Sequence, residues 1–343
     1  MWKDPLYNNT YKKISNLFNS ENSEVELSFS PYFIHYHRGF FSGEWDFETH
    51  VHYYYDIFLA TKAQDVRVLD IGCGFGLLSI FLGTFGAAEV IGIDLDAEKI
   101  SGFRSLLKFV DMEDGPVRAV LGDGLNIDYS DKTFDVIVVN DVLSHVRELE
   151  DFLEELTRLL IPGGKLYIYD DNNKLFLPSY YKYKEFWETC ENGPIDKINF
   201  RGKDERLSFA DMRKNIISEI EPDLAQYQLD YLVRKTIGMY GKEIESAVSE
   251  FKKNGRIKRC KGFKYRNPKT GEFPERPLNP YMISKALRNR GFSSRALPTF
   301  FFVKSTGLKG SIKRILSLLF RIIPSLSFII APSFRILSLK TKA

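Results

Sequence analysis

The stretch VRVLDIGCGFG, residues 66–76, decides the fold of this chain. It starts as a short apolar strand rich in β-branched residues, reaches Asp70, and continues into a turn with glycines at 72, 74 and 76. A glycine-rich turn from a strand into a helix lets backbone amides approach a nucleotide-like ligand. The stretch therefore predicts a cofactor-binding turn at the end of a sheet strand.

The spacing of the glycines argues against a dinucleotide. A dinucleotide fingerprint would need a glycine at position 77, where this chain has Leu77. Asp70 would repel a pyrophosphate but attract a cationic amino group. The turn therefore favours S-adenosylmethionine, which carries an amino group and a sulfonium but no phosphate.

Further motifs follow in order along the chain. AEVIGID ends at Asp94, about 20 residues beyond the glycine turn, where nucleotide-binding α/β folds place a carboxylate against ribose hydroxyls. The other motifs are LGDGL (121–125), FDVIVVNDVLSHV (134–146) and LLIPGGKLYIYD (159–170). With these motifs the chain resembles the class I S-adenosylmethionine-dependent methyltransferases.

The resemblance implies a role for individual residues of these motifs. Asp70 and the glycines of the turn would wrap the methionine part, Asp94 would bind both ribose hydroxyls, and Asp123 would accept from the adenine amino group. Asn140 would close the edge of the fourth strand. The cofactor contacts implied in this way are Asp70, Gly72, Cys73, Gly74, Gly76, Asp94, Leu95, Asp123, Gly124 and Asn140.

Short apolar strands alternate with helical stretches, which is typical of a parallel sheet covered on both faces. The strands are expected at 66–71, 89–94, 117–121, 134–139 and 165–169. PYMISKALRNRGF (280–292) is expected to form the last helix, and strands near 294–297 and 300–304 would complete the sheet as an antiparallel pair. The fold class is therefore α/β, a doubly wound Rossmann-like sheet of seven strands.

The chain is expected to hold one catalytic domain with additions. Residues 1–64 would form an aromatic, partly helical lid, and residues 65–171 with 278–305 the S-adenosylmethionine-binding domain. Residues 172–277 are too long for a bare loop and contain helical patterns, so they are expected to form a largely helical inserted substrate cap.

Residues 306–343 are expected to form a basic amphipathic tail. From Lys304 to the last residue there are eight Lys or Arg and no Asp or Glu, and IKRILSLLFRII (312–323) separates basic and apolar faces. This composition favours an interfacial membrane helix on an anionic surface, although packing against the domain or between subunits stays open. The longest charge-free run, 322–334, contains two prolines and is shorter than the roughly 20 residues of a membrane span.

A second basic segment, residues 251–271, has nine Lys or Arg and no acidic residue. It is compatible with an anionic membrane, a phosphate-bearing substrate, nucleic acid or a solvated loop. The chain has no recognisable RNA-binding module, and the residues before Lys304 are net acidic, which disfavours nucleic acid as a partner.

Two histidines are candidate catalytic residues. Methyl transfer needs a base only if a hydroxyl must lose a proton, and His145 follows the fourth strand, where related enzymes place a histidine beside the cofactor. His37 lies in the aromatic segment PYFIHYHRGFFSGEW (31–45). The pairs His35/His37 and His50/His52 would each share one face of an extended strand, but no ligand pattern is completed, so no metal is expected.

The sequence favours an enzyme, a methyltransferase acting on a hydroxyl of a glycan, a lipid-linked intermediate or another amphiphilic metabolite. The alternatives are methylation of a soluble small molecule or an isoprenoid quinone, and a non-catalytic scaffold that binds the cofactor. Three dispersed cysteines and the absence of a signal-peptide pattern predict a cytoplasmic protein, peripheral on the inner face of the membrane if the tail docks there.

Overall fold

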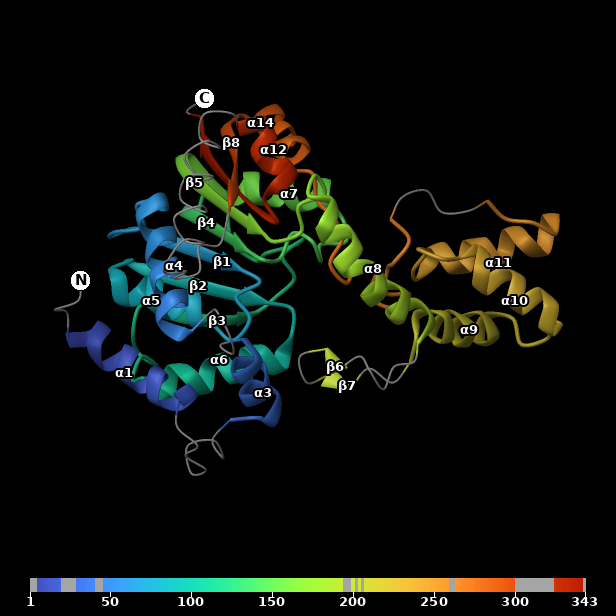
Figure 1. Cartoon of the computed structure of the whole chain (residues 1–343), viewed down its shortest axis with the longest axis horizontal. Coiled ribbons are helices and arrows are strands. Elements are labelled where there is room, and N and C mark those ends of the chain that lie inside the picture. Colours follow the sequence, from blue (N-terminus) through green and yellow to red (C-terminus); the bar gives the residue numbers. More distant parts are fainter. Residues whose placement is uncertain are drawn as a thin grey trace, which may run out of the picture. The chain divides into compact units, whose positions relative to one another are not determined.

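The computed structural model describes residues 5–19, 29–40, 46–193, 199–200, 203–204, 207–258, 263–299 and 324–341 (Figure 1). The chain divides into two compact units. We call residues 1–143, 148–176 and 279–343 the sheet unit, and residues 144–147 with 177–278 the helical unit. Each is described by itself.

The sheet unit is built on a seven-stranded sheet with the order β3-β2-β1-β4-β5-β9-β8. Its first five strands in this order are parallel, whereas β9 is antiparallel to both β5 and β8. The predicted fold class is confirmed. The strands are β1 (Arg67–Ile71), β2 (Glu89–Asp94), β3 (Val117–Leu121), β4 (Phe134–Asn140), β5 (Leu160–Asp170), β8 (Phe292–Thr299) and β9 (Ser333–Lys340).

The last part of the sheet differs from the expectation. Between β5 and β8 lies β9, which comes from the segment that we expected to be an amphipathic tail, 306–343. Phe334 and Ile336 of β9 are fully buried, and Lys340 donates from Nζ to the carbonyl oxygens of Thr157 (2.6 Å) and Leu160 (2.7 Å). The strand expected at 300–304 and the amphipathic stretch 312–323 lie outside the described residues.

Helices cover the sheet, and those at the N-terminus contribute an aromatic core. Phe33 stacks on Phe29 and meets Phe75 edge-on, while Phe47 packs against Phe81. The N-terminal segment therefore belongs to the core of the sheet unit. The helices are α1 (Pro5–Asn19), α3 (Pro31–Phe40), α4 (Phe47–Thr61), α5 (Leu77–Phe85), α6 (Ala97–Phe109), α7 (Leu149–Leu159), α12 (Pro280–Asn289) and α14 (Pro324–Ile330).

The helical unit has small cores of its own. Ile217, Leu232 and Ile244 form one of them, and the buried Arg213 guanidinium pairs with the buried Glu191 carboxylate beside another. Its elements are α8 (Leu177–Asn192), β6 (Asn199–Phe200), β7 (Lys203–Asp204), α9 (Phe209–Ile220), α10 (Gln226–Lys235) and α11 (Lys242–Asn254). Among the described helices of both units, none has the length and apolar character needed to cross a membrane.

Candidate active site

The glycine-rich turn follows β1 and is held by β2. The amides of Gly72 and Cys73 both donate to the Ile93 carbonyl oxygen, at 2.7 and 3.0 Å. Gly74 has φ +58°, and a Cβ atom built on it would meet no atom within 4 Å. The backbone at Gly74 therefore borders open space, where a ligand can approach it closely.

The other two glycines of the turn are required by packing. A Cβ atom on Gly72 would lie 2.3 Å from a methyl carbon of Val142, and one on Gly76 would lie 2.1 Å from the Phe103 ring. Both residues also have positive φ angles, +71° and +80°. Side chains at these two positions would clash with the domain itself, so packing alone explains why Gly72 and Gly76 are glycines. Gly74 is the glycine that indicates a ligand.

Asp94 ends β2 and joins two turns. Its Oδ2 atom accepts from the Gly74 amide (2.9 Å), and its Oδ1 atom accepts from the Asp96 amide (2.9 Å). The Lys99 ammonium lies 4.0 Å from Oδ2. Leu95, the next residue along the chain, is 53% exposed although it is a large apolar residue. A carboxylate and an exposed apolar side chain in sequence suit the ribose and adenine of a nucleoside.

Asp70 lies at the end of β1 and is almost completely buried. The Ser79 hydroxyl donates to its Oδ2 atom at 2.6 Å. Burial raises the pKa of Asp70 to about 7; the Ser79 hydrogen bond lowers this pKa and the Asp94 charge raises it. Burial likewise raises the pKa of the neighbouring Cys73 thiol well above its ordinary value. Asp70 is therefore poised to ionise near neutral pH if a cation comes close.

The motif with Asp123 and Gly124 follows β3, beside the end of β2. The amide of Gly122 donates to the Asp94 carbonyl oxygen at 3.1 Å, which brings the two predicted cofactor segments together. Asp123 Oδ1 accepts from the Leu125 amide at 3.0 Å, an arrangement typical of a turn. A Cβ atom on Gly124 would meet Ile71 and Phe152 at 3.1 Å.

Asn140 ends β4 and is held by a residue that the sequence analysis missed. The Tyr53 hydroxyl, from α4, donates to Asn140 Oδ1 at 2.6 Å, and it lies 3.5 Å from the Tyr167 hydroxyl of β5. Burial is the largest cause that raises the pKa of Tyr53 well above its ordinary value, so its hydroxyl stays protonated. The only sequence signal was the run of tyrosines at 53–55.

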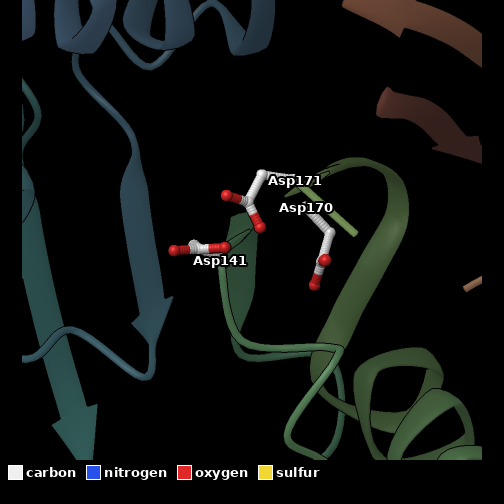
Figure 2. Close-up of side chains that lie close together, drawn as sticks. All are labelled: Asp141, Asp170 and Asp171. Carbon is white, nitrogen blue, oxygen red and sulfur yellow. The ribbon is translucent and has the colours of Figure 1, made fainter. Parts of the chain in front are cut away.

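Three carboxylates meet where β4 and β5 end, as Figure 2 shows. Asp141 follows β4, Asp170 ends β5, and Asp171 comes next; one oxygen of each lies within 4.8 Å of the others. The sequence analysis singled out none of the three. Their carboxylates concentrate negative charge at the same end of the sheet as Asp70, Asp94 and Asn140.

His145 belongs to the helical unit, where its Nδ1 atom has a hydrogen-bond acceptor and its Nε2 atom faces a carboxylate. Its Nδ1 atom lies 2.9 Å from the Phe273 carbonyl oxygen, which can only accept, so Nδ1 carries the proton. Its Nε2 atom lies 3.4 Å from Glu275 Oε1. The Ser144 hydroxyl donates to the other carboxylate oxygen of Glu275 at 3.4 Å.

His37 has a different environment from the one expected of a catalytic base. Its ring is 1% exposed, stacks on Phe18, and lies 2.9 Å through Nδ1 from the Phe33 carbonyl oxygen. Burial lowers the pKa of His37 to about 3. A neutral, enclosed imidazole suits packing, and we do not retain His37 as a base.

The two His-x-His pairs lie in helices and not in an extended strand. His35 and His37 lie in α3, and His50 and His52 lie in α4. Residues two apart on a helix point in different directions, so His50 and His52 do not present two ligands to one face. For the second pair a local cause is visible, because Asp46 accepts from the Thr49 amide and caps α4 at its N-terminus.

The residues present fit S-adenosylmethionine. The open backbone at Gly74 would admit the methionine part, the Asp94 carboxylate can accept from ribose hydroxyls, and Leu95 offers an apolar surface to adenine. Asp70 and the carboxylates that follow β4 and β5 complement its amino group and sulfonium. The turn has Leu77 where a dinucleotide fingerprint needs its third glycine.

Comparison with known proteins gives the class. Residues 69–168 match the family model described as "Methyltransferase domain", which spans β1 to β5. This part of the chain is similar to a methyltransferase domain, and the residues of its glycine turn and strand ends fit S-adenosylmethionine.

Particular relatives each match about a third of the chain. The chain is 30% identical over 113 residues to the norajmaline N-methyltransferase of Rauvolfia serpentina, covering 33% of this chain and 38% of that protein. It is 38% identical over 104 residues to the mitochondrial ubiquinone biosynthesis O-methyltransferase of Mus musculus, covering 30% of this chain and 28% of that protein. The chain thus spans well under half the length of these curated relatives.

Among solved structures, the YcgJ protein of Bacillus subtilis is similar with a TM-score of 0.44 and 13% identity, covering 85% of this chain and 99% of that one. This similarity is too low to carry an argument about function. The helical unit lies outside the matched family segment, except for residues 144–147.

Proposed function

We propose that this protein transfers the methyl group of S-adenosylmethionine to a hydroxyl of an amphiphilic acceptor, a glycan or a lipid-linked intermediate, at the cytoplasmic face of a membrane. The observation that carries the proposal is the pairing of an open glycine turn with the Asp94 carboxylate at the end of the sheet. The methyltransferase family match over the same strands supports it.

The chain's own residues would bind and orient the cofactor. Asp94 would accept from the ribose hydroxyls, Asp70 would face the amino group, and Asp123 would accept from the adenine amine. Cys73, Gly124 and Asn140 would complete the contacts along the turn and the two neighbouring strands. S-adenosylmethionine, when bound, supplies a methyl group on a sulfonium that is ready for in-line displacement.

Proton removal from the acceptor is the remaining task. We assign it to His145, because the proton on Nδ1 leaves the lone pair of the neutral ring on Nε2. A proton taken up there would form an ion pair with Glu275, whose carboxylate lies 3.4 Å away. The Glu275 carboxylate would thus stabilise the positive charge that His145 gains when it takes up the proton.

The amphiphilic acceptor is supported by the charge distribution of the chain. Residues 304–323, which precede α14 and β9, carry five basic and no acidic side chains, in a sequence that is otherwise rich in Ile, Leu and Phe. Such a segment is suited to an anionic lipid surface, where lipid-linked substrates reside.

An isoprenoid quinone precursor is the second candidate acceptor. It is supported by the match to ubiquinone biosynthesis O-methyltransferases, which includes 35% identity over 109 residues to the enzyme of Rhizobium johnstonii. A prenylated ring is also amphiphilic, so the membrane argument applies to both candidates.

Calorimetric titration with S-adenosylmethionine tests the cofactor site. We expect micromolar binding to the parent protein, loss of binding in Asp94→Ala, and unchanged binding in Glu98→Ala, an exposed acidic control on α6. NAD serves as the competing ligand. Preference for NAD, or equal binding by Asp94→Ala, would contradict the assignment.

Radiolabelled S-adenosylmethionine tests the acceptor class. The protein is incubated with a detergent-dispersed membrane lipid extract, with a water-soluble metabolite extract, or with a prenylated catechol. Label in the lipid extract supports the first candidate and label in the prenylated catechol supports the second. Label only among water-soluble products would contradict both.

A further inference from the structure

A tyrosine from α4 fixes the side chain at the end of β4. The Tyr53 hydroxyl lies 2.6 Å from Asn140 Oδ1, and it stays protonated because burial, the largest of several causes, raises the pKa of Tyr53 well above its ordinary value. A distance of 2.6 Å is normal for an O–H···O hydrogen bond and too short for one donated by an amide nitrogen. The atom that faces Tyr53 is therefore the amide oxygen of Asn140, which determines the orientation of the amide.

Tyr53 is itself held in place by residues of β5. Its ring meets the Tyr169 ring edge-on, with centroids 5.6 Å apart, and its oxygen lies 3.5 Å from the Tyr167 hydroxyl. Lys165, on the same strand, donates from Nζ to the Thr61 carbonyl oxygen at 2.9 Å, which ties the end of α4 to β5. The Tyr53 hydroxyl therefore has little freedom to move.

The amide nitrogen of Asn140 has a different environment. Asn140 is partly exposed, and no residue in the described part of the chain accepts a hydrogen bond from its Nδ2 atom. A primary amide nitrogen carries two N–H donors. Asn140 therefore offers N–H donors to a ligand at this end of the sheet, while its oxygen is engaged by the Tyr53 hydroxyl.

Asn140 lies beside the cofactor turn. Val139 pairs with Ile71, the last residue of β1, and a Cβ atom built on Gly72 would overlap the Val142 side chain. The chain on both sides of Asn140 thus runs along the start of the glycine turn, where the methionine part of the cofactor is proposed to bind. A donor here would border the methyl group that is transferred.

We propose that Asn140 selects acceptors that react through oxygen, by donating an N–H to the oxygen that attacks the methyl group, and that Tyr53 is the positioning residue that holds it. This deepens the proposed function and rests on it. A hydroxyl oxygen has two lone pairs, so one can accept from Nδ2 while the other attacks. An amine nitrogen has a single lone pair, and a hydrogen bond from Nδ2 would occupy the pair that must attack.

The same hydrogen bond would assist the reaction itself. As the acceptor oxygen forms its bond to the methyl carbon, the carbon–sulfur bond breaks, its electron pair stays on sulfur, and the hydroxyl proton leaves to the base. The N–H donor would stabilise the negative charge that builds up on the oxygen as this proton leaves. Because this charge is largest in the transition state, the donor would act on kcat more than on KM.

The neighbouring carboxylates also disfavour amine acceptors. Asp141 follows Asn140 directly, and its carboxylate lies close to those of Asp170 and Asp171 (Figure 2). Negative charge favours the protonated form of a nearby amine, and an ammonium group has no lone pair with which to attack a methyl group. The same carboxylates disfavour an ionised oxygen, which increases the effect of an N–H donor on that oxygen.

Two probes that carry a hydroxyl and an amine on one ring test the proposal: a prenylated 2-aminophenol and a glucosamine-linked lipid. The ratio of O-methylated to N-methylated product, measured by mass spectrometry, reports the choice of atom whatever the affinity for the probe. The variants are Tyr53→Phe and Asn140→Asp. Their matched controls are Tyr55→Phe, on the same helix, and Asn9→Asp, at an exposed position on α1.

The parent and both controls should give mainly O-methylated product. Tyr53→Phe should lower the ratio about three- to tenfold, the effect of one hydrogen bond, because the Asn140 amide can then turn. Asn140→Asp replaces the donor by an acceptor and should lower the ratio about tenfold or more. Thermal melting shows whether each variant is folded; if Asn140→Asp is not, Tyr53→Phe, which keeps its ring, carries the test.

An unchanged ratio in the folded variants would overturn the proposal, as would a parent that methylates mainly nitrogen. Loss of S-adenosylmethionine binding in Asn140→Asp with an unchanged ratio would also overturn it, because Asn140 would then serve the cofactor. If the parent labels an extract but neither probe, the methylated atom of the labelled product is identified: oxygen supports the proposal and nitrogen overturns it. Absence of methyl transfer to every probe and extract would contradict the proposed function, and this proposal with it.

Discussion

The imidazole of His145 is held between a carbonyl oxygen and a carboxylate, with Nε2 at 3.4 Å from Glu275 Oε1. The two residues are far apart in the sequence, and Glu275 has a φ angle of +64°, which a non-glycine residue rarely adopts. The backbone joins them further, since Phe273 and Arg276 donate their amides to the carbonyl oxygens of His145 and Ser144. The helical unit therefore fixes the orientation of this histidine.

Replacing His145 by Ala should lower kcat by about 100-fold or more if it is the base, because general base catalysis contributes about 10²- to 10⁴-fold. Glu275→Gln keeps the shape but removes the charge, and it should lower kcat by less. Affinity for S-adenosylmethionine should not change in either variant. Glu272→Gln, in the same loop, is the control; full turnover in His145→Ala would remove His145 from the mechanism.

Protonation of His37 should destabilise the fold. Its pKa is about 3 when folded, against an ordinary value of 6.5, because of burial. The unfolded chain therefore binds more protons, so stability is complete above about pH 6.5 and is lost as the pH falls toward 3, by about 2 kcal/mol at pH 5.

Urea unfolding over this pH range checks the expectation. His37→Phe should show a flatter loss of unfolding free energy with acid, whereas His52→Gln, at an exposed position on α4, should behave as the parent does. The same acid dependence in His37→Phe and the parent would assign the effect to other groups.

Affinity for S-adenosylmethionine should rise with pH through Asp70. Its pKa of about 7 in the free protein means that a fraction is protonated at neutral pH, and a nearby ligand cation favours the ionised form. Binding should thus release a proton and strengthen between about pH 6 and pH 8. Calorimetry in buffers of different ionisation enthalpy measures the proton, and Asp70→Asn should abolish that release.

The glycine turn offers a pair of variants with opposite consequences. Gly76→Ala should destabilise the protein by roughly 2–4 kcal/mol, because its methyl group overlaps the Phe103 ring and φ is positive. Gly74→Ala has room and should cost only about 1 kcal/mol of stability. It should weaken S-adenosylmethionine binding about tenfold, because the methyl group enters the ligand's space.

Melting temperatures and calorimetric affinities for both variants decide this point. If Gly74→Ala binds S-adenosylmethionine as tightly as the parent does, the open space at Gly74 is not where the ligand approaches.

Local patterns were enough to predict most of the sheet. The apolar runs at 66–71, 89–94, 117–121 and 134–139 predicted β1 to β4, because buried parallel strands read as continuous apolar segments. The glycine turn and the acidic strand ends were likewise visible, since each lies within a few residues of its strand.

Contacts between distant residues were not predictable in this way. Tyr53 and Asn140 come from α4 and β4, and His145 and Glu275 are joined only by tertiary folding. Likewise, β9 reads SFRILSLK, a basic and polar alternation that resembles a surface tail when its partners β5 and β8 are unknown. The extended geometry considered for the histidine pairs does not occur, because both pairs lie in helices.

The position of β9 has a consequence for biosynthesis. The strand pairs Leu339 with Lys165 and lies between β5 and β8, so this side of the sheet is completed by residues that are made after both neighbouring strands. While a ribosome is still adding the last residues, β5 and β8 would each present an unpaired edge, a template for pairing with other chains. A chain truncated at Lys309 would lack β9, and the edges of β5 and β8 would stay unpaired. Loss of membrane binding in such a chain would therefore report on the integrity of the sheet, and not on a contact between the basic residues 310–343 and lipid.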